Sequence, residues 1–117
     1  MLIRTLVGLG VFLSASLASA EFIDGQKLKE MLDAGTRIDR GDVRSGDYQD
    51  AARANGYVLG VVDTVSFIFI CPHDGVKAGQ LTAMVKKYLE ENPDKWSQSG
   101  DKIVINALKP TFPCQKK

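Results

Sequence analysis

The sequence is poor in the side chains from which most catalytic and metal centres are built. Among its 117 residues there is one histidine, His73, and there are two cysteines, Cys71 and Cys114. A structural zinc site needs three or four ligands with paired spacing, which this chain cannot supply. A cysteine nucleophile needs a free thiolate with a base in reach, but Pro72 separates Cys71 from His73. Glycine-rich phosphate loops, dinucleotide fingerprints and nucleophile elbows are also missing. We therefore expect no catalysis, no cofactor and no metal.

An excess of charge of one sign is lacking as well. Arg4 is the only charged residue among the first twenty, which leaves 14 basic and 14 acidic side chains in residues 21–117. The only basic cluster is Lys116-Lys117, and no basic stripe alternates with aromatic residues. Neither nucleic acid nor a membrane surface is therefore expected as a partner of the mature chain.

A hydrophobic run long enough to cross a membrane is missing too. The apolar segment Leu6–Leu17 has 12 residues, whereas a spanning helix needs about 20. Arg4 precedes this segment and Ala18-Ser19-Ala20 follows it, which is the pattern of a cleavable secretory signal peptide. The sequence therefore predicts a signal peptide over residues 1–20 and a single exported domain over residues 21–117.

The two cysteines lie in the part that would be exported. In an oxidising compartment, a disulfide between Cys71 and Cys114 is the default expectation. Closing a loop of about 43 residues would contribute roughly 4 kcal/mol in the chain-entropy model. For a domain of this size that is a large share of the total stability.

The first amphipathic segment is short. Leu28, Met31 and Leu32 repeat at helical spacing, which predicts a helix over residues 24–34. Asp24 is expected to cap its start, and Gly35 to end it in a left-handed conformation. Residues 35–46 carry alternating charges without a period and are interpreted as a loop.

The second segment is the longest. Apolar residues repeat at three- and four-residue steps from Asp47, which predicts a helix up to about Ile70, with Ile68 and Phe69 facing inward. The β-branched and aromatic residues of its second half leave a buried strand open as an alternative. Gly56 and Gly60 lie one turn apart on one face, and we interpret them as allowing another helix to approach closely.

Two further helices complete the domain. A third helix is predicted from Ala78 to the Asn92-Pro93 stop, with an apolar stripe that includes Leu81 and Leu89. A fourth helix, capped by Ser99, is predicted from Gly100 to Leu108. The expected fold is all-α: a small four-helix domain, exported and joined by one disulfide.

Exposed polar residues are expected on the turn that follows Cys71. His73, Asp74 and Lys77 are candidates for contact with a partner protein, because a braced loop suits presentation. The alternative is a solvated helix start at which Asp74 interacts with the helix dipole. Asp63 could be a functional carboxylate or a solvent-facing one. Trp96, like Tyr57, could be a binding anchor or could pack over the edge of the core.

Four segments, in this order and spacing, resemble the Tai/Rap-type immunity proteins of type VI secretion. They are GYVLGVVD at 56–63, C-P-x-x-GV-x-x-GQL at 71–81, VKKYLEENP at 85–93 and ALKPTFPC at 107–114. The resemblance extends over residues 24–114. It implies a periplasmic, helical, disulfide-bonded and often dimeric protein that binds and blocks a peptidoglycan amidase effector. If the exposed turn has a function beyond folding, we expect it in the contact of His73 and Asp74 with a partner protein.

The resemblance also has a gap. Cys71 and Cys114 match one cysteine pair of the family, whereas a second pair that members commonly carry is absent. Ala54 stands at one of its positions, and Asp33 or Ala34 at the other. A small periplasmic stress or chaperone-like protein is the alternative function, and an isolated gene induced by envelope stress would favour it.

Overall fold

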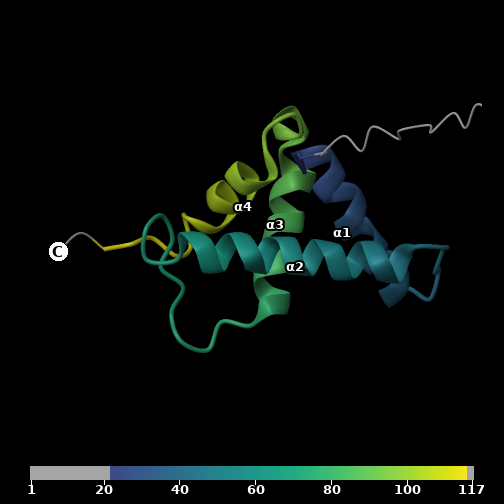
Figure 1. Cartoon of the computed structure of the whole chain (residues 1–117), viewed down its shortest axis with the longest axis horizontal. Helices are drawn as coiled ribbons and strands as arrows, with labels where there is room; N and C mark the ends of the chain where they lie inside the picture. Colours follow the sequence, from purple (N-terminus) through teal and green to yellow (C-terminus); the bar gives the residue numbers. More distant parts are fainter. Residues whose placement is uncertain (1–21, 116–117) are drawn as a thin grey trace, which may run out of the picture.

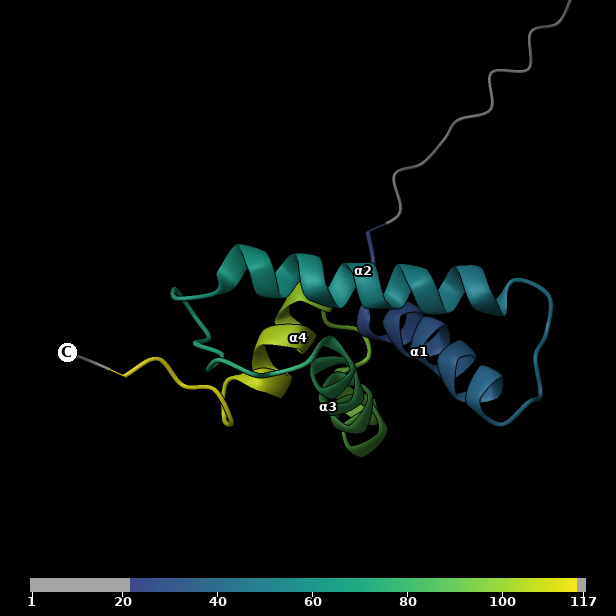
Figure 2. The ribbon, with the colours of Figure 1, turned by 90° about the horizontal axis from the view of Figure 1, so that it is seen from below.

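Four α-helices form a two-layer domain in the computed structural model, which describes residues 22–115. They are α1 (Gly25–Asp39), α2 (Asp47–Val65), α3 (Ala78–Glu91) and α4 (Gly100–Leu108), with a short 3-10 helix, η1 (Pro93–Lys95), before α4. Helix α2 forms one layer, and α1, α3 and α4 lie together on one side of it (Figures 1 and 2). No β-strand forms in this part of the chain. The all-α prediction is confirmed, while the expected signal peptide lies outside the described residues.

Each helix contributes an apolar stripe to a single core. The stripes are the ones that the sequence periodicity predicts for the first, third and fourth helices. The buried apolar residues are Leu28, Met31, Leu32, Ala54, Val58, Val62, Ile70, Leu81, Val85, Leu89, Ile103, Val104, Leu108 and Phe112. Because α2 is packed on one side only, much of its other face stays open to solvent.

The start of α1 is tied to the segment that precedes α4. The first four N–H groups of a helix have no partners within it, and in α1 all four find acceptors outside it. Two donate to the carbonyls of Gln98 and Trp96, at 2.9 and 3.0 Å. The other two donate to Asp24, one of them to its side chain at 2.8 Å, so the predicted cap is confirmed. Gly100 in turn donates its N–H to the carbonyl of Ile23 at 2.8 Å. We call these contacts the clasp.

The clasp explains why two of its residues are glycines. A Cβ atom added to Gly25 would lie 2.9 Å from both the Cα and the carbonyl oxygen of Trp96. At Gly100 the added atom would lie 2.6 Å from the hydroxyl oxygen of Tyr57. The added atom at Gly100 would also lie 2.9 Å from the carbonyl oxygen of Ile23. These distances are shorter than real Cβ contacts allow, so a larger side chain at either glycine would push the two segments of the clasp apart.

The predicted end of α1 at Gly35 is wrong, because the helix continues to Asp39. Gly35 lies inside it, and its missing Cβ would stand 3.9 Å from the Cβ of Ala51 on α2. The extra turn carries Arg37, whose guanidinium donates to both carboxylate oxygens of Asp47 at 2.7 and 3.0 Å. This ion pair between the end of α1 and the start of α2 stabilises the turn that local sequence signals do not predict.

Gly41 terminates helix α1 and adopts the left-handed conformation that the sequence predicts for Gly35. Gly41 has a φ of 75°, in the left-handed region. Its N–H donates to the carbonyl of Ile38 at 3.0 Å, and the N–H of Asp42 donates to that of Arg37 at 2.9 Å. These two bonds define a Schellman motif. The predicted loop 35–46 is therefore shorter than expected.

The predicted end of α2 at Ile70 is also wrong, since the helix ends at Val65. Ser66 turns into an extended conformation, and both its N–H and its hydroxyl donate to the carbonyl of Val62, at 2.9 and 2.6 Å. The following residues form a turn instead of either a helix or the alternative strand. Tertiary contacts explain this, because Ile70 is buried and Cys71 is held against the C-terminal tail.

The third and fourth helices begin and end where the sequence predicts. Ser99 occupies the position that precedes α4, but its side chain makes no capping hydrogen bond to the helix backbone. A hydrogen bond from Ser99 instead lowers the pKa of the Asp101 carboxyl.

Candidate functional site

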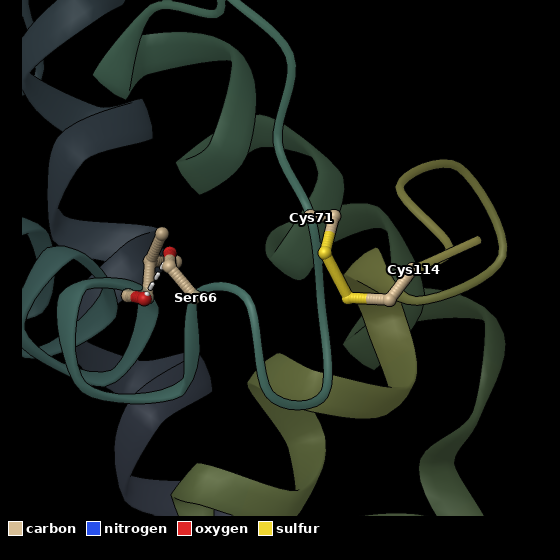
Figure 3. Close-up of a disulfide and its surroundings, with 4 residues drawn as sticks. Ser66, Cys71 and Cys114 are labelled. Atoms are coloured by element: carbon tan, nitrogen blue, oxygen red, sulfur yellow. Dashed lines mark hydrogen bonds between the residues drawn. A yellow bond between two sulfur atoms is a disulfide. The ribbon is translucent and has the colours of Figure 1, made fainter. Parts of the chain in front are cut away.

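A disulfide joins the segment after α2 to the tail of the chain. Cys71 and Cys114 are bonded, with their Cα atoms 4.9 Å apart, which confirms the predicted pairing (Figure 3). Beside the bond, the N–H of Cys71 donates to the carbonyl of Phe112 at 2.9 Å. With Ile70 and Phe112 both buried, the covalent link and the hydrogen bond hold this point of the chain to the core.

The five residues between α2 and this link, Ser66–Ile70, form what we call the apolar loop. At its tip, Phe67, Ile68 and Phe69 are 81%, 66% and 50% exposed, while Ile70 is fully buried. The prediction that Ile68 and Phe69 face inward is therefore wrong. Three consecutive large apolar side chains point towards solvent at one end of α2.

Backbone hydrogen bonds fix the shape of the apolar loop. The N–H of Phe67 donates to the carbonyl of Ile70 at 2.8 Å, which closes the turn. The N–H groups of Ile68 and Phe69 both donate to the carbonyl of Val65, at 3.1 and 3.0 Å. Phe67 has a φ of 66°, and this left-handed conformation costs a residue with a Cβ about 1–2 kcal/mol. The loop is thus short, closed and held at both ends.

The three candidate contact residues lie on the segment that follows. His73, Asp74 and Lys77 are all exposed, as expected. The rings of His73 and Phe112 pack edge to face, with their centroids 5.5 Å apart, so part of the imidazole is already in contact with the domain. The N–H of Lys77 donates to the side chain of Gln80 at 2.8 Å, where α3 begins. These residues share one exposed segment with the apolar loop, and their contact role stays a prediction.

The other polar and aromatic candidates have structural environments. Asp63 is exposed to solvent. The indole N–H of Trp96 donates to the carbonyl of Leu89 at 2.8 Å, and the ammonium of Lys29 lies 5.3 Å from the centre of the indole ring. Tyr57 is half-buried against the clasp, and this burial raises the pKa of its hydroxyl. Both aromatic residues therefore pack at the edge of the core.

Gly56 and Gly60 do not receive another helix, so that interpretation is wrong. A Cβ atom at either glycine would meet nothing within 4 Å. The two glycines instead belong to an open groove of about 400 Å³ on α2, which Val61, Val65 and Asp101 also line. The groove is mostly apolar, and it reaches Val65, the residue that precedes the apolar loop.

The described residues contain no constellation that would support metal chemistry. No three His, Cys, Asp or Glu side chains within residues 22–115 are placed to hold a metal ion. Across the same part of the chain, none of the helices combines the length and apolarity needed to cross a bilayer. What the fold presents is a small disulfide-linked helical domain with an exposed, rigid apolar loop, which is a surface suited to binding.

Comparison with known proteins defines the class further. The family model of the Rap1a immunity proteins matches residues 24–114, and the chain belongs to this family. No curated protein matches the chain. Membership indicates an immunity protein that binds a secreted effector, and it favours a non-enzymatic inhibitor. The family that the sequence motifs resemble is thus confirmed.

Proposed function

We propose that this chain is a periplasmic immunity protein that binds and occludes a peptidoglycan amidase effector delivered by type VI secretion. The observation that carries the proposal is the family match over residues 24–114. The disulfide between Cys71 and Cys114 supports an oxidising compartment, and the pattern of residues 1–20 supports export to one.

Inhibition would follow from insertion of a braced segment into the substrate cleft of the effector. The segment between α2 and α3 is the best candidate, since α2, the buried Ile70 and the disulfide hold its first half. His73, Asp74 and Lys77 are exposed on its second half and would contact the cleft rim. A segment that is ordered before binding loses little conformational entropy in the complex, which favours tight inhibition.

Co-expression tests the proposal. A peptidoglycan amidase effector, sought first among the genes that neighbour this one, is directed to the periplasm, where we expect it to lyse cells that lack the chain. Cells that also express the full chain should survive, and the purified pair should form a stable complex by calorimetry. Lysis in the presence of the chain, together with no measurable complex with the effector, would refute the proposal.

A matched variant tests the location. A chain that begins at residue 21 should stay in the cytoplasm, if residues 1–20 direct export, and it should fold once its disulfide is formed by oxidation after purification. It should therefore fail to protect against the periplasmic effector while it binds the same effector in vitro. Protection by this shortened chain would argue against a periplasmic site of action.

A further inference from the structure

We propose that the tip of the apolar loop, Phe67-Ile68-Phe69, is the principal contact for the effector and enters an apolar cleft on it. The inference rests on the proposed function for the kind of partner, and on the loop itself for the contact residues. It assigns the binding energy to apolar side chains just before the disulfide, and not to the polar residues after it.

The tip of the apolar loop is exposed to solvent. The three side chains are 81%, 66% and 50% exposed, and no other part of the described chain covers them. A run of three large exposed apolar residues opposes solubility unless it serves an interaction. Aromatic residues at the centre of an interface also carry a disproportionate share of its binding energy. Two phenylalanines in one tight turn match that chemistry.

The backbone of the apolar loop is strained at Phe67. Phe67 has a φ of 66°, a conformation that glycine adopts without cost and a phenylalanine does not. Strain of this kind persists where the surrounding structure fixes it, and it concentrates at binding sites. The side chain of Phe67 makes no contribution to the core, being the most exposed of the three. A binding role explains why a large side chain occupies a position that suits glycine.

Rigidity and charge point to a concave protein partner. The loop is closed by its own hydrogen bonds, and the buried Ile70 and the disulfide anchor its end. The nearest exposed acidic groups on either side of it along the chain are Asp63 and Asp74. Loops that insert into anionic membranes are flanked by basic residues instead. Carboxylates beside an apolar tip are complementary to an apolar cleft with basic side chains at its rim.

Family membership favours an effector over a second copy of the chain as the partner of the apolar loop. A Rap1a immunity protein acts by binding a different protein, so a heterologous partner is already required. A second copy of the chain would offer the groove at Gly56 and Gly60 to the loop, and the experiment separates these two partners.

The experiment compares two loop variants with one control. Phe67→Gly removes the aromatic ring and relieves the backbone strain, and Phe69→Ser removes the second ring. Tyr48→Ser is the control, because Tyr48 is a 66% exposed aromatic residue at the other end of α2. Each full-length chain is titrated against the amidase effector used in the rescue experiment, and each is melted to verify its fold.

The expected result separates binding from folding. Phe67→Gly should melt at or above the temperature of the wild type, yet bind the effector about thirtyfold or more weakly. Phe69→Ser should also bind more weakly with little change in melting temperature, and both should protect cells poorly. Tyr48→Ser should stay within about twofold of the wild-type affinity.

Four results would overturn the inference. If the wild type binds the effector and both loop variants bind it equally well, the apolar loop is not the contact, although the proposed function stands. If the wild type binds no effector, both proposals fall. If light scattering shows a wild-type dimer that the loop variants lose, the partner of the loop is a second copy of the chain. If the wild type sediments with anionic lipid vesicles and the loop variants do not, the partner is a membrane.

Discussion

Removal of the Cys71–Cys114 disulfide gives the most direct test of how this domain is stabilised. The bond joins residues 43 apart in the sequence. For a loop of that length the chain-entropy model gives about 4 kcal/mol, because the cross-link restricts the unfolded chain. In a domain of roughly one hundred residues, each kcal/mol shifts the melting temperature by about 4–8 °C. The full effect is therefore a decrease of about 15–30 °C.

The assay uses two routes to the same state. The Cys71→Ser/Cys114→Ser variant and the chemically reduced wild type should melt at similar temperatures, both well below that of the oxidised protein. Both cysteines are half-buried, so serine is tolerated sterically. Denaturant titration should also show a steeper transition without the bond, since the unfolded chain then exposes more surface. A midpoint that stays within about 3 °C of the oxidised protein, after thiol titration verifies reduction, would refute the entropic reasoning.

The remaining predictions concern the helix contacts. The pKa of the Asp47 carboxyl is lowered to about 2, mainly by the hydrogen bonds from Arg37. The ionised carboxylate therefore stabilises the folded state above about pH 4, and this stabilisation is lost as the pH falls towards 2. Melting curves from pH 6 to pH 2 should show this loss, and an Asp47→Asn variant should show less of it. Gly25→Ala should lower the melting temperature by about 5–20 °C, because it forces the clasp open. The control Gly79→Ala, whose added Cβ meets nothing within 4 Å, should not lower it. Equal effects of the two variants would refute the predicted clash at Gly25. Gly35→Cys/Ala51→Cys should cross-link α1 to α2 under oxidising conditions, since a Cβ separation of 3.9 Å suits a disulfide. Non-reducing mass spectrometry and a higher melting temperature would verify this bond, and an uncross-linked product would contradict it.

Local signals in the sequence predict the helices that local forces determine. The start of α1 at Asp24, the stop of α3 at Asn92-Pro93 and the bounds of α4 follow from caps, breakers and apolar spacing, and the structure has them. The ends of α1 and α2 do not follow from such signals. An ion pair from Arg37 to a residue beyond the loop extends α1, and a cross-link to the distant tail shortens the apolar run of α2.

The same limit applies to the candidate site. The disulfide and the exposure of His73 and Asp74 could be predicted, because a cysteine pair and a turn bounded by Pro72 and Gly75 can be recognised from the sequence alone. The apolar loop could not, since the apolar spacing of Ile68 and Phe69 continues the phase of α2. A signal was nevertheless present: Ser66, followed by the aromatic and β-branched residues 67–70 directly before Cys71-Pro72, favours an exit from the helix over its continuation.

The clasp determines the order in which this molecule can be completed. The first turn of α1 obtains two of its hydrogen-bond acceptors from Trp96 and Gln98, which are made long after the rest of that helix. A chain that ends before this segment leaves those N–H groups to water and removes the carbonyl wall against which Gly25 packs. The α1–α2 pair could then dock early, but the beginning of the domain would stay frayed until its last quarter arrived. During synthesis, the N-terminal turn of α1 is therefore completed only when the segment before α4 has been made.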